Sequence, residues 1–278
     1  MVTGQIGPRG RQLRSATMSS LPPPPPGAPP PPPPGPPGPP PNIPPGYTPY
    51  QQHGLVAGRG EQVVGLAKAI QVLVAIVLVT NVVTLVLLLA SRSQFSDFLN
   101  DLADEDDVRS TINTLVAVGT LAGAVQLAAA ICTMIWMWRL ARNVQLAGRP
   151  HQTWAPGWAI GGWFCPPCVF VIPWLMLMEL WKGSDPSTAP GDPAWKSKPG
   201  WPLITVWWVL FGLSGIILAG MQLSSTGSMS QDVEDAADFY DSTIGWTVLS
   251  SIATIAAGIC FILIVRRMTE RQRLLTGQ

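Results

Sequence analysis

Cys165 and Cys168, separated by Pro166 and Pro167, are the residues whose types and spacing most plainly allow chemistry. A Cys-x-x-Cys pair at a helix start can form a disulfide, and the helix dipole lowers the thiol pKa there. An apolar setting raises that pKa, and no thioredoxin-like strand–helix pattern surrounds the pair. Metal binding would need two further ligands. We therefore expect the two cysteines to pack as small residues, without a metal or another cofactor.

Glu179 is the second candidate, because a carboxylate at the end of an apolar stretch of a membrane protein marks a functional hypothesis. Lys182 follows three residues later, at the spacing of neighbours on a helix surface. The sequence therefore predicts an interfacial Glu179–Lys182 ion pair. Eleven of the twelve tryptophans, Trp158, Trp163 and Trp181 among them, lie between positions 136 and 208. They are typical of an aromatic belt, and a stacking platform for a ligand is the alternative.

Other catalytic patterns are missing from the sequence. There is no phosphate-binding glycine loop, no Ser/His/Asp set with sensible spacing and no zinc-protease helix motif. The acidic runs at 104–107 and 232–241 lack the turn glycine of a calcium loop, so they are expected to be solvated. We predict a chain that is not an enzyme, has no catalytic residue and does not bind nucleic acid.

Five apolar stretches must position these residues: about 69–91, 111–138, 157–181, 201–223 and 243–265. Each approaches or exceeds the roughly 20 residues that span a bilayer core. Charged residues make up only 12% of the chain, against about a quarter in soluble domains. Helices satisfy every backbone group in lipid, so the stretches are expected to be helical. The composition therefore indicates an all-α integral membrane protein.

The charges between these stretches indicate how many of them cross. Segments 92–109 and 232–241 are predominantly acidic, whereas 139–149 and 266–273 are predominantly basic. Five crossings would place the basic carboxyl end outside, against the tendency of Lys and Arg to stay on the cytoplasmic side. If 157–181 does not cross, the basic segments all fall on the cytoplasmic side. We predict four transmembrane helices with both termini cytoplasmic.

Segment 157–181 also carries the residues of a non-crossing piece. Pro166 and Pro167 are adjacent, Pro173 follows, and paired glycines precede them. Prolines remove backbone donors and break a helix. The sequence therefore predicts a Pro-broken re-entrant segment, and a kinked fifth helix is the alternative.

The amino-terminal region has a different composition. Residues 21–49 hold nineteen of the thirty prolines, mixed with glycine. Such a run is extended or disordered and serves as a tether, or as a docking peptide for an aromatic groove. The predicted organisation is a disordered Pro/Gly-rich cytoplasmic tail over 1–60, a helical membrane domain over 61–268, and a basic cytoplasmic tail over 269–278.

A block of tryptophan, glycine and proline residues resembles an uncharacterised bacterial membrane family, the domain of unknown function 4328. The resemblance covers about 65–268, and its specific part is Trp154, Gly157-Trp158, Gly162-Trp163-Phe164, Pro166, Pro173, Glu179-Leu-Trp181-Lys-Gly-Ser184-Asp185-Pro186 and Trp207-Trp208. It implies a multi-pass protein of the bacterial plasma membrane, chiefly in actinobacteria, often with a Pro/Gly-rich tail. It implies no activity. In the family, positions 165 and 168 are usually apolar or small and polar, so no shared thiol function follows.

Three functions are consistent with these observations. The first is a non-enzymatic membrane scaffold or sensor, with the proline-rich tail as tether for a cytoplasmic partner. The second is a small-molecule or ion transporter or channel, lined by the broken segment 157–181. The third is a membrane thiol oxidoreductase that uses the cysteine pair. The candidate functional residues are Cys165, Pro166, Pro167, Cys168, Pro173, Glu179, Trp158, Trp163, Trp181 and Asp185.

Overall fold

The computed structural model describes residues 60–165, 168–225 and 233–277. The described residues are helical apart from their connections: α1 (Val64–Ala90), α2 (Arg92–Leu99), α3 (Glu105–Leu146), α4 (Trp158–Phe164), α5 (Ile172–Gly183), α6 (Pro202–Ser225) and α7 (Val233–Thr276), with the short 3-10 helices η1 (Cys168–Phe170) and η2 (Pro193–Ser197). The disordered tail predicted from the sequence falls almost wholly on residues 1–59, which lie outside the described part.

Four helices, α1, α3, α6 and α7, are long and apolar enough to cross a membrane. Each corresponds to one of the predicted stretches, which exceed α1 and α6 by a single residue at one end, so the prediction of four membrane helices is confirmed. In α3 the Asp104 side chain accepts the Asp106 N–H, and three acidic residues occupy the first turn. Negative charge at a helix start is stabilised by the helix dipole. The chain therefore begins its second span on an acidic turn.

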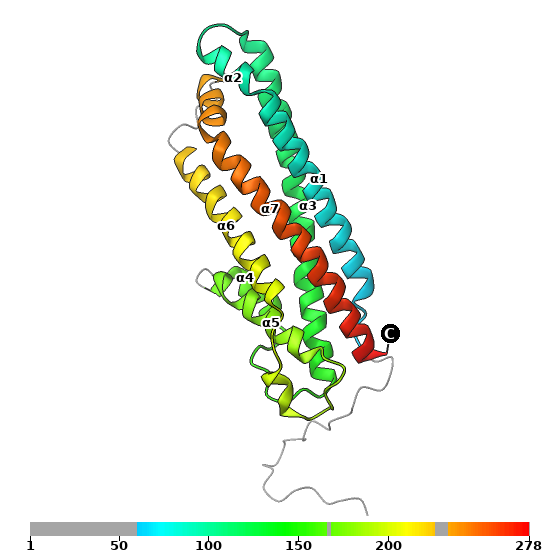
Figure 1. The fold of residues 1–278 in the computed structure, drawn as a ribbon. Coiled ribbons are helices and arrows are strands. Elements are labelled where there is room, and N and C mark those ends of the chain that lie inside the picture. The colour runs from blue at the N-terminus through cyan, green and yellow to red at the C-terminus, as the bar shows by residue number, and fades with distance from the viewer. Residues whose placement is uncertain (1–59, 166–167, 226–232, 278) are drawn as a thin grey trace, which may run out of the picture. The chain divides into compact units, whose positions relative to one another are not determined.

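The four long helices run alongside one another (Figure 1), with α1 packed on α3 and α7, and α7 packed on α6. We call one end of this bundle the basic end: there Asn143, near the end of α3, bonds the backbone of Glu61, just before α1. We call the other end the acidic end. It joins α1, α2 and the starts of α3 and α7 through an apolar cluster that includes Leu88, Phe95 and Val233.

Segment 158–183 forms a helical hairpin, hereafter the hairpin. Its helices α4 and α5 have 7 and 12 residues, too few to cross a bilayer of about 30 Å. They pack on each other and on α3. At the end of α5, Glu179 accepts the backbone N–H groups of Thr153 at 2.6 Å and Trp154 at 3.2 Å, both just before α4. The segment therefore returns to the end from which it started, and it is not a kinked fifth span.

Two residues explain the shape of the hairpin. Pro173 lies in the first turn of α5, where its missing N–H leaves no helical bond unmade. Gly162 of α4 faces α5 so closely that a Cβ there would lie 2.8 Å from a methyl carbon of Ile172. The proline thus starts the returning helix, and the glycine allows the two short helices to touch.

The carboxyl end differs from the predicted organisation. Residues 269–278 were expected as a separate basic tail, but α7 continues to Thr276. Thr269, Gln272 and Thr276 recur at helical spacing and are buried. The Trp136 indole N–H donates to the Thr269 hydroxyl at 3.3 Å. An inward-facing polar stripe therefore keeps the last turns of α7 within the fold.

Candidate functional site

The predicted site residues separate into two groups. Trp181 and Asp185 lie at the basic end beside three cations, Arg149, Lys198 and Arg271. The cysteine pair and Trp163 belong to α4 and its junction with η1 at the far turn of the hairpin. The first group is the more elaborate, and we call Arg149, Asp185, Ser187, Lys198 and Arg271 the Asp185 cluster.

Asp185 is the centre of this cluster. Its Oδ2 lies 2.8 Å from Nζ of Lys198 and 3.1 Å from Nη2 of Arg271. Its Oδ1 accepts the backbone N–H of Ser187 at 2.9 Å and the Ser187 hydroxyl at 2.8 Å. Burial raises the pKa of Asp185, but the bonds from Lys198 and Ser187 and the charge of Arg271 outweigh it and hold that pKa well below its usual range. Asp185 is therefore a carboxylate at neutral pH.

Arg149 organises the chain around this carboxylate. It follows Gly148, whose φ of +68° is accessible to glycine without strain and lets the chain turn at the end of α3. Arg149 is 5% exposed, and its guanidinium donates four hydrogen bonds to backbone carbonyls at the end of α5 and in the connection that follows: Gly183, Asp185, Thr188 and Ala189. Burial lowers the pKa of Arg149, partly offset by Asp185 and Asp192. An arginine nevertheless stays protonated in proteins.

Helix α7 supplies the remaining wall of the site. The Arg271 guanidinium lies 4.0 Å above the Trp181 ring, a cation–π distance. Trp181 in turn stacks on Trp201 with 4.6 Å between ring centroids. One residue further on, Gln272 donates to the Ser184 hydroxyl at 2.6 Å. These contacts fasten the end of α5, the start of α6 and the end of α7 together.

Glu179 has a different partner from the predicted one. Its carboxylate bonds the backbone N–H groups before α4, and Lys182 instead donates to the Lys196 carbonyl at 3.2 Å. Two loop N–H groups outside a helix lack intrahelical acceptors, and a carboxylate satisfies both at once. The structure therefore uses Glu179 to close the hairpin rather than in an ion pair with Lys182.

The far turn of the hairpin contains Cys165 and Cys168, which are joined by a disulfide. The sequence predicts that they pack as small residues and leaves a disulfide open, and the bond links the end of α4 to η1. Pro166 and Pro167 lie outside the described residues. Nearby, the Trp208 indole N–H of α6 donates to the Phe170 carbonyl at 3.0 Å, and Trp163 meets Trp208 edge to face. Phe164 and Phe170 are exposed, so this turn presents an apolar surface.

Trp158, predicted as an interfacial residue, stands at the start of α4 and is 40% exposed. Its ring meets that of Trp154 edge to face at 5.9 Å. The rings of Trp207 and Phe261 stack at 4.8 Å, which ties α6 to α7. Most of the described tryptophans are buried or half-buried, whereas Trp158 and Trp246 are exposed.

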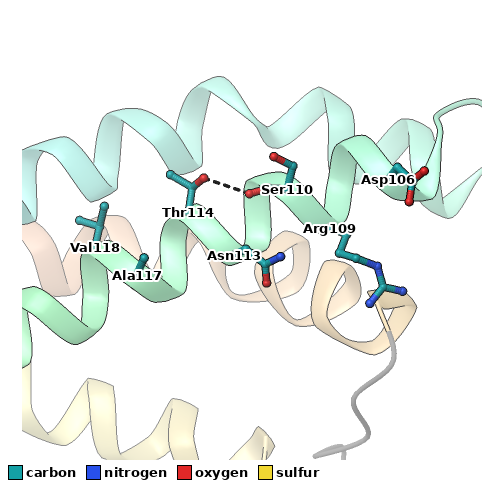
Figure 2. A pocket seen from close by; sticks show the side chains of 7 residues that line it. All are labelled: Asp106, Arg109, Ser110, Asn113, Thr114, Ala117 and Val118. Atoms are coloured by element: carbon teal, nitrogen blue, oxygen red, sulfur yellow. Dashed lines mark hydrogen bonds between the residues drawn. The ribbon is translucent and has the colours of Figure 1, made fainter.

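One cavity lies near each end of the bundle. A groove of about 520 Å³ lies on α3 near the acidic end, lined by Asp106, Arg109, Ser110, Asn113, Thr114, Ala117 and Val118. Figure 2 shows the Thr114 hydroxyl directed to the Ser110 carbonyl within it. A second cavity, of about 230 Å³, lies at the basic end with Arg149 and Thr188 in its wall. Only the second touches the Asp185 cluster.

The chemistry of the Asp185 cluster is that of an anchored charge network. Its carboxylate is shared by two cations, and its buried arginine is bound by carbonyl oxygens. Among the described residues there is no group of three or more His, Cys, Asp and Glu side chains that could hold a metal ion. The arrangement is suited to holding a loop in one conformation and to presenting positive charge.

Sequence reasoning did not identify Arg149, Lys198 or Arg271 as site residues. Arg149 and Arg271 were interpreted as orientation signals, since the basic segments are predicted to face one side of the membrane. A usable signal lies in Gly148-Arg149-Pro150, where a lone arginine is held between two turn-forming residues directly after a long helix. Asp185 entered the candidate set through the family resemblance alone.

Comparison with known proteins places this architecture in a family. No curated protein and no solved structure matches the chain. Residues 100–270 match the family described as domain of unknown function (DUF4328). The match runs from just before α3 into the last turns of α7, and it includes the whole hairpin and Asp185. The chain therefore belongs to the DUF4328 family of proteins.

Proposed function

We propose that this protein is a non-enzymatic membrane scaffold or sensor whose basic end faces the cytoplasm of a bacterial cell. The observation that carries the proposal is the Asp185 cluster. Its charged groups are bound to one another and to backbone carbonyls, which suits a fixed surface better than a catalytic centre. On that surface, the connection after α5 is held in one conformation next to the end of α7.

The proline-rich segment 21–49 would serve as the tether. Polyproline segments dock into aromatic grooves with little loss of conformational entropy. Described residue 60 and the end of α7 belong to the same end of the bundle, because Glu61 bonds Asn143 and Gln272 bonds Ser184. A partner bound by the tether would therefore meet a preformed protein surface close to the membrane.

The side of the membrane can be tested with single cysteines in an otherwise cysteine-free chain. Ala189→Cys places a thiol at an exposed position of the basic end, and Leu102→Cys places one at the acidic end, where the side chain is 77% exposed. An impermeant maleimide should label Leu102→Cys in intact cells and Ala189→Cys only in opened cells. The reverse pattern would exclude a cytoplasmic partner at the basic end.

The scaffold role itself is tested by crosslinking followed by mass spectrometry, on the full chain and on a chain lacking residues 21–49. We expect defined crosslinks between lysines of the basic end, such as Lys196, and one cytoplasmic protein. These crosslinks should be lost in the shortened chain. Identical crosslinks with and without the segment would argue against the tether.

A small transporter or channel is the second candidate, and the hairpin is the observation that favours it. Non-helical backbone at membrane depth occurs where protein covers it or where it lines a water-filled path. The helical backbone of the hairpin is interrupted between α4 and α5, and Gly161 of α4 has no neighbouring atoms where a Cβ would stand. Solute flux into liposomes containing the purified protein would support this function over the scaffold.

A further inference from the structure

The cavity at the basic end is lined by both polar and apolar residues. Arg149 and Thr188 are the polar ones, and Ala147, Pro190 and Leu275 are among the apolar ones. Its volume of about 230 Å³ is below the roughly 300 Å³ at which pockets for drug-sized molecules begin. The cavity is therefore matched to a small group, such as the head of a larger molecule.

Thr188 has a hydroxyl that the protein leaves without a partner. The residue is 7% exposed, and its Oγ1 makes no hydrogen bond within the described part of the chain. Its backbone carbonyl, by contrast, is bound by Arg149. Buried hydroxyl groups are nearly always hydrogen-bonded, because losing water without a replacement is unfavourable. Thr188 is one of the residues that line the cavity, and a ligand bound there would supply the partner that its buried hydroxyl lacks.

Arg149 offers a donor beside this hydroxyl. A guanidinium has five N–H groups, and four hydrogen bonds to carbonyls account for four of them. The remaining N–H, on Nη2, has no acceptor among the described residues. Arg149 and Thr188 line the same cavity, and a guanidinium N–H and a hydroxyl can both donate to the oxygen atoms of an anion.

The surrounding charge also favours an anion. Three cations, Arg149, Lys198 and Arg271, surround the single carboxylate of Asp185, and Asp192 acts on Arg149 from further away. When both acidic residues are included, three positively charged side chains lie near two negatively charged ones. A partly buried surplus of positive charge is unfavourable unless a counter-charge approaches it.

We propose that this cavity binds a phosphate group, with Thr188 Oγ1 and Arg149 Nη2 as hydrogen-bond donors. Phosphate presents several acceptor oxygens to arginine. Its source is either a free phosphate or the head group of an anionic phospholipid at the membrane surface, and the same donors serve both. The proposal concerns a ligand of the fold and does not depend on the scaffold function proposed above.

Thermal unfolding of the purified full-length chain tests the proposal in two arms. In the first, inorganic phosphate is titrated into the delipidated protein in detergent at constant ionic strength. In the second, the protein is reconstituted in nanodiscs of phosphatidylcholine with increasing phosphatidylglycerol. Stabilisation in the first arm assigns a free phosphate, and stabilisation in the second arm alone assigns a lipid head group.

Two variants connect that stabilisation to the cavity. Thr188→Val keeps the shape of the side chain and removes the hydroxyl, and we expect the ligand to bind about tenfold more weakly. Thr114→Val is the matched control, since Thr114 lies in the groove of Figure 2 at the other end of the molecule. It should respond to phosphate or lipid as the parent protein does.

Ala147→Leu provides an independent measurement if Thr188→Val does not fold. It adds volume at the cavity wall and leaves both donors in place, so it should abolish the stabilisation. The proposal is overturned if neither arm stabilises the parent protein. It is equally overturned if Thr188→Val or Ala147→Leu gains as much stability as Thr114→Val from the ligand that stabilises the parent.

Discussion

The two ends of the bundle are built from the same kinds of helix, yet different forces hold them. At the basic end, polar side chains join residues far apart in sequence: Arg149 bonds the connection after α5, and Gln272 bonds Ser184 across 88 positions. At the acidic end, the polar contacts between described residues are mostly local, such as the Arg109–Glu105 pair one helical turn apart. There an apolar cluster around Phe95 and Val108 joins the helices.

This difference follows from what each end must hold. The acidic end connects consecutive helices through the short helix α2, and apolar packing is enough to align them. The basic end must fix a long irregular connection between α5 and α6, whose backbone carbonyls have no helical partners. A buried arginine satisfies four of those carbonyls at once. A buried charge therefore stabilises the irregular connection at the basic end, whereas apolar contacts join the regular helices at the acidic end.

The largest effect is expected when Arg149 is replaced. Arg149→Met leaves four carbonyls of the α5–α6 connection without a donor in a buried site, and we expect a loss of about 3–5 kcal/mol in the free energy of unfolding. Arg109→Met at the acidic end removes an exposed pair, with side chains 52% and 56% exposed, and should cost less than about 0.5 kcal/mol. Equilibrium unfolding of both variants in one detergent measures the contrast, and equal losses would refute it.

Replacing glycine tests the packing of the two ends. A Cβ at Gly183 would lie 2.7 Å from a methyl carbon of Val144, whereas a Cβ at Gly119 of α3 meets no atom within 4 Å. We expect Gly183→Ala to lower the free energy of unfolding by about 1–3 kcal/mol through overpacking. Gly119→Ala should leave it unchanged or raise it by up to about 1 kcal/mol. If the Gly119→Ala variant is destabilised, the part of α3 near the acidic end packs more tightly than the open space around Gly119 indicates.

Asp185→Asn removes the shared charge of the basic end while keeping the size of the side chain. We expect a loss of about 1–3 kcal/mol at neutral pH, because Lys198 and Arg271 lose a charged acceptor. The pKa of Asp185 in the folded protein lies below the unfolded value of about 3.9. Its stabilisation is therefore present above that pH and disappears as the pH falls below it.

Unfolding curves of the parent protein and Asp185→Asn between neutral and acidic pH check this sign. Their difference in stability should be constant near neutral pH and shrink at strongly acidic pH. A difference that grows on acidification would show that Asp185 is protonated in the fold. Asp104→Asn supplies the acidic-end counterpart, since Asp104 caps α3 at an exposed position.

The smallest effect is expected at Gln272. The Gln272→Met variant removes the bond to Ser184 but keeps the volume of a fully buried side chain. The expected loss is at most about 1 kcal/mol, the value of one neutral hydrogen bond, because the variant also removes Oε1, which is buried without a partner among the described residues. Met268→Leu, one turn earlier on α7 and also buried, is a control for packing alone. Unfolding midpoints should separate the two variants, and a neutral Gln272→Met would show that apolar packing alone holds the end of α7.

The sequence predicts the regular part of this architecture well. Charge-free stretches of membrane length correspond to α1, α3, α6 and α7. The alternation of acidic and basic segments, with the prolines around Pro173, predicts that 157–181 is not a further span. Both signals are local or periodic, because each helix must satisfy its own backbone in lipid.

The candidate site was less predictable, since its contacts join distant positions that leave no periodic trace. Glu179 was assigned to the cation nearest in sequence, although loop N–H groups 25 and 26 residues away are its partners. Arg149 was interpreted as a marker of orientation, which does not conflict with its role as a hydrogen-bond donor to backbone carbonyls. Spacing along one helix can predict a pair on that helix, but it cannot predict where an irregular connection folds back.

Helix α7 has a mechanical consequence. Its 44 residues extend about 66 Å at roughly 1.5 Å per residue, about twice the thickness of a bilayer core. Tyr240 near its start stacks on Phe95 at the acidic end, and Arg271 near its finish holds Asp185 at the basic end. An unbroken helix resists compression and twisting along its axis. A displacement or rotation applied to α7 at the acidic end is therefore transmitted along the helix to Asp185 at the basic end.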